Sequence, residues 1–250
     1  KEKSGFVKIP CIIMPGSRIK IPSSKLDTYM EKKRLIITKQ VQVQRFHQDS
    51  TAFRNDQTIV LNDEQQHALD RILSLVDSPG MECALLHGIT GSGKTEVYLQ
   101  LIDRVLSQGR KAIVLVPEIS LTPQLVSRFS KRFGHKIAVI HSGLSLSEKY
   151  DQWKKIRDGN AKIVIGARSA IFAPLDNIGV IIMDEEHEHT YKSEMTPRYT
   201  THEVSEFLAR QHDALLLFAS ATPSVSSYYK TKTGKTKLLT LEKRYNDMPV

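Results

Sequence analysis

From residue 61 onward, short runs of apolar residues alternate with segments that have the pattern of amphipathic helices. Uninterrupted apolar strands joined by helices are typical of a parallel sheet that helices cover on both faces. The sequence therefore predicts an α/β domain of three layers over roughly residues 61–246. The expected strands are 83–87, 112–116, 136–141, 161–166, 179–183, 214–219 and 237–242, and the expected helices are 62–76, 95–107, 123–133, 145–158 and 200–211.

The first 50 residues have a different pattern and most of the excess charge. They predict short strands at 6–10, 18–22 and 35–46, the first ended by Pro10, with one marginal helix and then a polar linker at 49–57. Residues 1–60 hold 12 Lys/Arg against 5 Asp/Glu, whereas residues 61–250 hold 24 against 22. The net charge of +9 thus lies mainly in the first quarter, where it favours a polyanionic partner. A solvated basic face would give the same count.

The composition excludes several classes of protein. With 40% hydrophobic and 25% charged residues the chain is too apolar for a disordered tail. No apolar run approaches the roughly 18 residues that a transmembrane helix needs. Cys11 and Cys83 have no metal-ligand spacing, so a reducing cytoplasm is the simplest location. Because the chain begins at Lys1 and ends at Val250 without a turn or capping signal, we expect part of a longer protein.

Residues 88–95, Gly-Ile-Thr-Gly-Ser-Gly-Lys-Thr, match the pattern G-x-x-x-x-G-K-[ST] in full. They follow an expected strand and begin an expected helix, which is the context in which this pattern binds nucleotide phosphates. Glycines allow a turn that directs backbone N–H groups at an anion, Lys94 can reach the β- and γ-phosphates, and the Thr95 hydroxyl can ligate Mg²⁺. A glycine-rich surface turn is the less favoured alternative. The predicted ATP-binding residues here are Gly88, Thr90, Gly91, Ser92, Gly93, Lys94 and Thr95.

An acidic segment, Asp184-Glu185-Glu186-His187, directly follows the expected strand 179–183. That strand delivers Asp184 to the carboxyl edge of the sheet, where α/β proteins bind ligands. Asp184 is predicted to hold Mg²⁺ through water and Glu185 to polarise the attacking water, with Lys94 as the third catalytic residue. A solvated acidic strand end is the alternative, which the neighbouring phosphate motif makes less favoured.

Three histidines near this segment raise the question of a zinc site, namely His187, His189 and His202. Their spacing is loose and no cysteine lies nearby, so a metal site is the less favoured interpretation. We instead predict His187 to be a polar residue that couples neighbouring loops.

Polar loops follow three further strands: 116–122, 166–170 with Arg168, and 220–223 with Ser220 and Thr222. Hydroxyls, backbone N–H groups and one arginine suit the phosphates of a single nucleic-acid strand. The segment 191–199 mixes aromatic and basic residues, as a base-stacking element does. Taken singly, each of the three loops is better explained as an ordinary polar loop, and the segment 191–199 is explained equally well as one.

Together and in this order, these segments closely resemble the motifs of the superfamily 2 helicases. Residues 88–95 are similar to motif I, 116–122 to motif Ia, 184–187 to a DEEH version of the DEAH box, and 220–222 to motif III. Finer signatures resemble the bacterial primosomal helicases within that superfamily; these are residues 61–65, 88–98, 116–122, 141–142, 166–170, 184–187, 191–192, 198–199 and 220–224. The resemblance covers about residues 55–250.

The resemblance implies that residues 55–246 form the first RecA-like lobe of an ATP-dependent 3′-to-5′ DNA helicase of replication restart. It implies that Gln65 recognises the adenine and that Ser220 and Thr222 couple the state of ATP to DNA. The implied loop between DNA and the ATP site includes Lys192, Arg198 and Tyr199. Implied partners are forked or single-stranded DNA, other primosome proteins and the single-strand binding protein.

The resemblance also implies what surrounds this lobe. A winged-helix domain precedes it in the family, so residues 1–50 are expected to be the end of that domain plus a linker. A second lobe with ATP-facing arginines and a cysteine-rich zinc module follow it. Since such an arginine contributes about 10³–10⁵-fold to phosphoryl transfer, we expect the chain alone to bind nucleotide but to turn over little ATP.

Two other functions stay open at this point. The chain could belong to a different P-loop NTPase, such as a kinase or a double-strand translocase. A kinase would transfer phosphate to a small acceptor, and the motif at 220–222 would then be accidental. It could also be a non-catalytic interaction module whose P-loop holds nucleotide structurally. The substitution Glu185→Gln in the full-length protein distinguishes these functions. It would abolish ATP turnover but spare ATP binding if Glu185 is the base, and it would change nothing if the fold is only a scaffold.

Overall fold

The computed structural model describes the backbone of residues 7–14, 17–20 and 37–41, and residues 60–244 except 195 and 197. The chain divides into two compact units, residues 1–48 and residues 49–250. Each unit is described by itself below. None of the helices in the described residues is long and apolar enough to cross a membrane.

The first unit contains a small antiparallel sheet with the strand order β2-β1-β3. Its strands are β1 (Val7–Met14), β2 (Ser17–Lys20) and β3 (Ile37–Val41). The expectation that Pro10 ends the first strand is wrong, because β1 continues to Met14. Pro10 pairs with Thr38 of β3, whereas the pairing with β2 begins only at Cys11. A residue without an N–H group is tolerated where a strand is paired on one side. The predicted marginal helix and the linker at 49–57 lie outside the described residues.

The second unit is built on a seven-stranded sheet with the order β10-β4-β9-β8-β5-β7-β6. All of its neighbouring strands are parallel, so the prediction of a parallel α/β sheet is confirmed. Because the strands are parallel, the loops at their carboxyl ends lie along one edge of the sheet. The strands are β4 (Cys83–Gly88), β5 (Lys111–Leu115), β6 (Ile137–Ile140), β7 (Ile163–Gly166), β8 (Ile178–Asp184), β9 (Leu215–Ser220) and β10 (Lys237–Leu241).

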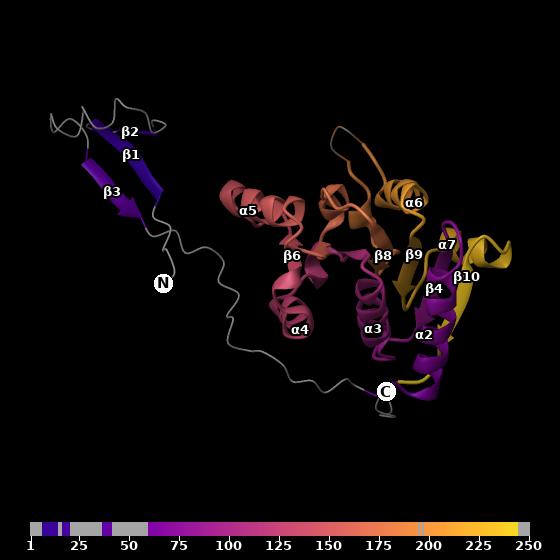
Figure 1. The fold of residues 1–250 in the computed structure, drawn as a ribbon. Helices are drawn as coiled ribbons and strands as arrows, with labels where there is room; N and C mark the ends of the chain where they lie inside the picture. The colour runs from indigo at the N-terminus through magenta and orange to yellow at the C-terminus, as the bar shows by residue number, and fades with distance from the viewer. Residues whose placement is uncertain are drawn as a thin grey trace. The chain divides into compact units, whose positions relative to one another are not determined.

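Helices cover both faces of this sheet, as Figure 1 shows. One buried apolar cluster lies between the sheet and the helices α2 (Asp63–Val76), α3 (Lys94–Ser107) and α4 (Pro123–Phe133). A second cluster lies on the opposite face, against α5 (Leu146–Arg157) and α6 (Thr201–Gln211). Strands that are buried on both faces explain why their sequences are continuously apolar rather than alternating. The three-layer arrangement is therefore confirmed.

The helix starts follow from local capping chemistry. Asn62 and Gln65 form a reciprocal capping box before α2, and Ser145 and Glu148 form another before α5. Thr122 caps α4, whose first residue is proline. Side-chain caps of this kind satisfy the free N–H groups of the first helical turn. Since these contacts span only three residues, the sequence is sufficient to predict them.

One helix, α7 (Val225–Lys232), was not predicted from the sequence. It is rich in serine, threonine and tyrosine, which are weak helix formers, and Ser227 is its one buried residue. It therefore has no apolar stripe that would reveal a helical period. Ser224 caps its start by accepting a hydrogen bond from the N–H of Ser227.

Candidate functional site

The glycine-rich loop after β4 has the backbone that an anion-binding turn requires. Gly91 and Gly93 have φ angles of 82° and 81°, a region that favours glycine. A Cβ atom on Gly88 would lie 2.6 Å from the Ser92 hydroxyl oxygen and 2.9 Å from Cβ of Leu241. The hydroxyl oxygen of Ser92 is buried without a hydrogen-bond partner. The predicted glycines thus stand where larger residues would be strained or would clash.

Lys94, the first residue of α3, folds back over this loop. Its ammonium group donates a hydrogen bond to the Gly88 carbonyl oxygen at 2.7 Å and lies 3.4 Å from the Ile89 carbonyl oxygen. Burial lowers the pKa of Lys94, whereas the carboxylates of Glu185 and Asp184 act to raise it. The positive charge is therefore held by backbone carbonyls and acidic neighbours in the place where phosphates are expected to bind.

Gln65 is fully buried and contacts the loop rather than an open pocket. Its side-chain amide donates to the Ser92 carbonyl oxygen at 2.8 Å, and its side-chain oxygen accepts from the N–H of Asn62 at 3.0 Å. In this structure Gln65 therefore connects the start of α2 to the phosphate loop. Recognition of an adenine by Gln65 stays a prediction, and it requires these contacts to rearrange.

Asp184, at the carboxyl end of β8, lies close to Thr95. The hydroxyl of Tyr98 donates to a carboxylate oxygen of Asp184 at 3.0 Å and is 3.4 Å from the Thr95 hydroxyl oxygen. Burial, and next the carboxylate of Glu185, raises the pKa of Asp184 to about 6. The Thr95 hydroxyl and the Asp184 carboxylate both contact the Tyr98 hydroxyl, and both are oxygen ligands of the kind that Mg²⁺ prefers. The donor set thus fits the predicted magnesium site.

An open pocket of about 370 Å³ lies beside these residues. Sequence reasoning missed Arg128 of α4, which lines this pocket and donates to the buried carboxylate of Glu96 at 2.9 Å. Arg132 of α4 holds the other oxygen of the same carboxylate. The pocket therefore has a second cation besides Lys94. Its lining residues are Thr90, Gly91, Gly93, Lys94, Thr95, Glu96, Arg128, Asp184 and Glu185.

His187 connects the acidic turn to the loop after β9. Its Nδ1 atom is 2.9 Å from the Ser220 hydroxyl oxygen and 3.7 Å from a carboxylate oxygen of Glu185. Its Nε2 atom is 3.4 Å from the Thr222 hydroxyl oxygen. The structure thus brings the predicted coupling residues together, next to Glu185. Glu185 itself has a φ of 46°, which is uncommon for a residue other than glycine.

Glu186, which received no predicted role, is a buried structural residue of the acidic turn. Its carboxylate accepts hydrogen bonds from the Ser224 N–H at 2.6 Å and from the Ser227 hydroxyl at 2.9 Å, and lies 3.3 Å from Nε2 of His202. Burial by itself would raise the pKa of Glu186, but hydrogen bonds from His202, Ser224 and Ser227 hold it below its usual value. Glu186 therefore fixes the start of α7.

Two of the three histidines that raised the zinc question have polar neighbours of their own. His187 contacts Ser220, and His202 contacts Glu186. Within residues 60–244, apart from 195 and 197, no group of three or more histidine, cysteine or acidic side chains is placed to hold a metal ion. The predicted coupling role of His187 is consistent with its contacts.

The segment 191–199 is divided between the core and the surface. Tyr191 is buried, and its hydroxyl lies 2.7 Å from the Asp184 carbonyl oxygen and 3.0 Å from that of Leu115. Arg168 donates to the Lys192 carbonyl oxygen at 2.6 Å. The buried ring of Tyr191 is therefore not available for base stacking, which corrects the prediction for this residue of the segment.

The outer part of this segment keeps the predicted surface character. Lys192 and Arg198 are exposed, and Lys192 forms an antiparallel bridge with Thr200. The ring of Tyr199 packs edge-on against Phe172, with centroids 5.0 Å apart. The structure therefore places these predicted residues beside the segment that contains Arg168.

Comparison with known proteins identifies the family. Residues 58–225, more than half of the chain, match the ResIII family, described as the res subunit of type III restriction enzymes. The chain belongs to the ResIII family. The ResIII match includes the phosphate loop, the acidic turn and the loop after β9.

Among curated proteins, this ResIII chain is similar to replication restart proteins named PriA. The one from Bacillus subtilis (strain 168) is 47% identical over 245 residues, which are 94% of this chain and 30% of the relative. The one from Synechocystis is 44% identical over 208 residues, 83% of this chain and 24% of the relative. The resemblance to the primosomal helicases is confirmed. The chain spans less than a third of the length of these relatives.

Solved structures agree on the fold. The ResIII chain is similar to RecG bound to a three-way DNA junction, with a TM-score of 0.55 and 26% identity over 76% of this chain and 24% of that one. A hypothetical ATP-dependent RNA helicase from Sulfolobus tokodaii has a TM-score of 0.51 and 20% identity, over 74% of this chain and 53% of that one. The RecA-like fold class is therefore confirmed.

Proposed function

We propose that residues 55–246 are the ATP-binding lobe of a DNA helicase of replication restart, similar to PriA. The observation that carries the proposal is the pocket in which the phosphate loop, Asp184 and Glu185 meet. The similarity to PriA proteins supports the assignment to replication restart. By the same similarity we propose 3′-to-5′ movement, a cytoplasmic location, and primosome proteins and the single-strand binding protein as partners.

In the proposed reaction, the phosphate loop, Lys94, Thr95, Asp184 and Glu185 have distinct tasks. The N–H groups of the phosphate loop and the Lys94 ammonium group bind the β- and γ-phosphates. Thr95 and Asp184 would hold Mg²⁺, which supplies charge neutralisation on those phosphates when it is bound. Glu185 orients the attacking water and accepts its proton. Lys94 leaves its bond to the Gly88 carbonyl oxygen when phosphate arrives.

Coupling to DNA is proposed to run through His187. It lies between Glu185, beside the nucleotide pocket, and Ser220 at the carboxyl end of β9. A change at Glu185 when the γ-phosphate leaves would alter these contacts. The same sheet edge carries Arg168 and the segment 191–199, the proposed contacts to a DNA strand. The similarity to RecG, whose solved structure is bound to a three-way DNA junction, supports DNA as the substrate.

Nucleotide binding to this chain tests the first part of the proposal. A fluorescent ATP analogue with Mg²⁺ is expected to bind the chain, and Lys94→Ala is expected to weaken binding by about a hundredfold or more, since it removes a charge-assisted hydrogen bond to phosphate. Lys131→Ala, at an exposed position on α4, is the control. Binding that is equal in all three proteins would contradict the proposal.

Turnover tests the second part. We expect the chain alone to hydrolyse ATP slowly, and the complete protein to hydrolyse it faster with forked DNA present. Glu185→Gln in the complete protein is expected to lower kcat by about 10²-fold or more while nucleotide affinity stays near its original value. Hydrolysis by the complete protein that does not respond to DNA would exclude the helicase function.

A further inference from the structure

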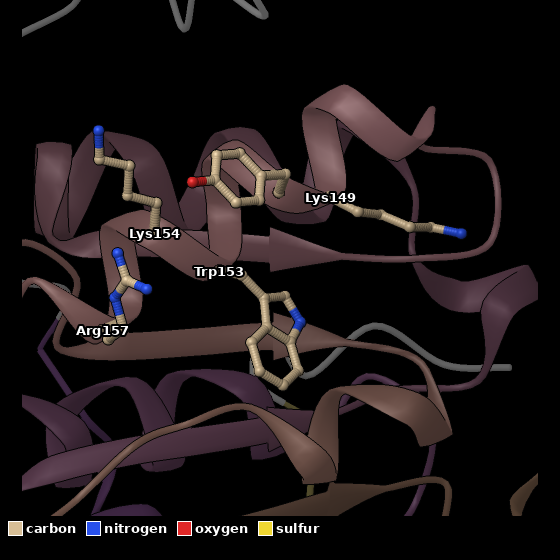
Figure 2. Close-up of a pocket in the computed structure, with 5 residues that line it drawn as sticks. Lys149, Trp153, Lys154 and Arg157 are labelled. Carbon is tan, nitrogen blue, oxygen red and sulfur yellow. The ribbon is translucent and has the colours of Figure 1, made fainter.

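The outer face of α5 carries aromatic and basic side chains that neither the fold nor the proposed ATP site uses. Tyr150, Trp153, Lys154 and Arg157 follow one another at helical spacing, and Lys149 lies beside them. These five side chains line a shallow pocket. Figure 2 shows Trp153 projecting from the helix, with Lys149 toward one end of the helix and Lys154 and Arg157 toward the other. Tyr150 is 63% exposed and Trp153 is 45% exposed.

The inner face of α5 packs against the sheet and hydrogen-bonds to its edge strand. Ile156 is its buried residue and belongs to the apolar cluster on that side of the sheet. Gln152 accepts a hydrogen bond from the Val139 N–H at 3.1 Å, and Lys155 donates to the Ile137 carbonyl oxygen at 2.7 Å. Both side chains satisfy the open edge of β6, the last strand of the sheet. The fold therefore uses the inner face of α5, whereas the rings of Tyr150 and Trp153 on the outer face are exposed.

The charge of the outer face favours an anionic partner. Three cationic side chains and two aromatic rings line the pocket, and no acidic side chain is among its lining residues. The ion pair found for Arg157 is with Asp158, at 3.5 Å and with both side chains well exposed. An exposed pair of this kind is weak and is easily exchanged for a phosphate.

We propose that the outer face of α5 binds single-stranded DNA. Bases stack on Trp153 and Tyr150, and the phosphates contact Lys149, Lys154 and Arg157. This combination suits a single strand because unpaired bases expose their flat faces to aromatic rings, whereas a duplex buries them. The inference rests on the proposed function, in which DNA is the substrate.

The position of α5 fits a strand that also contacts the loops of the sheet edge. The segment 141–145 joins the carboxyl end of β6 to the start of α5, so the helix begins at the edge where the proposed DNA contacts lie. β6 pairs with β7, and the segment that follows β7 carries Arg168. A single strand leaving the neighbourhood of Arg168 can therefore continue along α5.

The single tryptophan of the chain makes the inference directly measurable. When the chain is titrated with oligo(dT), stacking is expected to quench the emission of Trp153, and added salt is expected to reverse the quenching. In anisotropy measurements with labelled oligo(dT), Trp153→Ala is expected to weaken binding by about tenfold, and Trp153→Phe by less, because phenylalanine still stacks. Thermal unfolding of each variant checks that the fold is kept.

The basic residues have their own matched comparison. The double substitution Lys154→Gln with Arg157→Gln is expected to weaken binding and to reduce the salt dependence, by a slope of about 0.7 for each cation that no longer neutralises a phosphate. Lys131→Gln with Lys235→Gln, which removes the same charge from two exposed positions elsewhere, is the control. Equal reductions in affinity in the two double variants would overturn the inference, because bulk charge would then be the cause.

Three further outcomes separate this inference from the proposed function. If the chain binds oligo(dT) but emission and affinity do not respond to changes on α5, the inference alone is wrong. If the chain binds the ATP analogue but no oligo(dT), the DNA coupling in the proposed function fails as well. If polyglutamate quenches Trp153 as strongly as oligo(dT) does, the face is a site for acidic peptides, and the inference is overturned.

Discussion

At the scale of single residues, the acidic turn after β8 contains carboxylates with two different roles. Asp184 and Glu185 line the proposed nucleotide pocket, whereas the next carboxylate, Glu186, is buried and hydrogen-bonded to residues of α6 and α7. Neighbouring positions with similar side chains therefore have different partners. We therefore expect a substitution at Glu186 to act mainly on the stability of the protein.

Glu186→Gln is expected to lower the free energy of unfolding by about 2–4 kcal/mol, because buried charge-assisted hydrogen bonds disappear and their donors are left without an anion. Glu188→Gln is the matched control; Glu188 is half-buried, and its ion-pair contact to His187 is at 4.0 Å. Urea unfolding of both variants measures the difference. Equal midpoints would show that the carboxylate of Glu186 has no structural role.

Tyr98→Phe tests the hydroxyl that lies between Thr95 and Asp184. The ring is buried and stacks on Phe129, so phenylalanine keeps the packing and removes one hydrogen bond to a carboxylate. We expect a decrease of about 1–2 kcal/mol in the free energy of unfolding. Tyr229→Phe, at a position that is 66% exposed, should cause no measurable decrease. Thermal unfolding of the two variants side by side checks this.

At the scale of elements, the most informative contact is the one between α5 and β6. An edge strand exposes unpaired N–H and carbonyl groups, which favour pairing with another chain. Here two side chains of one helix satisfy that edge, and the same helix presents aromatic and basic residues on its other side. The helix therefore covers the edge strand β6 with one face and carries the proposed DNA-binding residues on the other.

Gln152→Ala is expected to lower the free energy of unfolding by about 1–3 kcal/mol, because the Val139 N–H loses its partner at the edge of the sheet. It should also raise the tendency to aggregate, since β6 becomes an open edge. Gln124→Ala, an exposed glutamine on α4, is the control. Denaturant unfolding and light scattering would reveal both effects, and identical behaviour of the two variants would contradict the protective role of α5.

At the scale of the whole molecule, the chain divides into two compact units, residues 1–48 and residues 49–250. Both buried apolar clusters of the second unit consist of residues between Leu61 and Leu241. The basic excess of the chain belongs mainly to residues 1–60, whereas the segments proposed to bind ATP and DNA belong to the nearly neutral remainder. The DNA contacts proposed for the second unit would therefore come from a few well-placed side chains rather than from its bulk charge.

Removal of residues 1–59 is expected to leave the second unit folded. Its melting temperature should stay within about 3 °C of the corresponding transition in the full chain, since every described residue of its two apolar clusters is kept. Its affinity for the ATP analogue should also be unchanged. Calorimetry and nucleotide titration of both proteins measure this, and a shortened chain without a cooperative transition would show that the units depend on each other.

The sequence by itself determined the features that depend on neighbouring residues. Apolar runs, the capping boxes at Asn62 and Ser145, and the glycines of the phosphate loop act over a few positions, so the elements and the nucleotide motif were predictable. Helix α7 was not, because its stability comes from the contact of Ser224 and Ser227 with Glu186 rather than from its own pattern.

Only the tertiary structure decided the strand order and the partners of the buried polar groups. Gln65 turns toward Ser92, Tyr191 lies beneath Asp184, and Arg128 comes to the pocket from α4. Each of these contacts joins residues that belong to different turns, strands or helices. Local periodicity tells which side chains are buried, but hydrogen bonds between polar groups depend on which elements the packing of the core brings together.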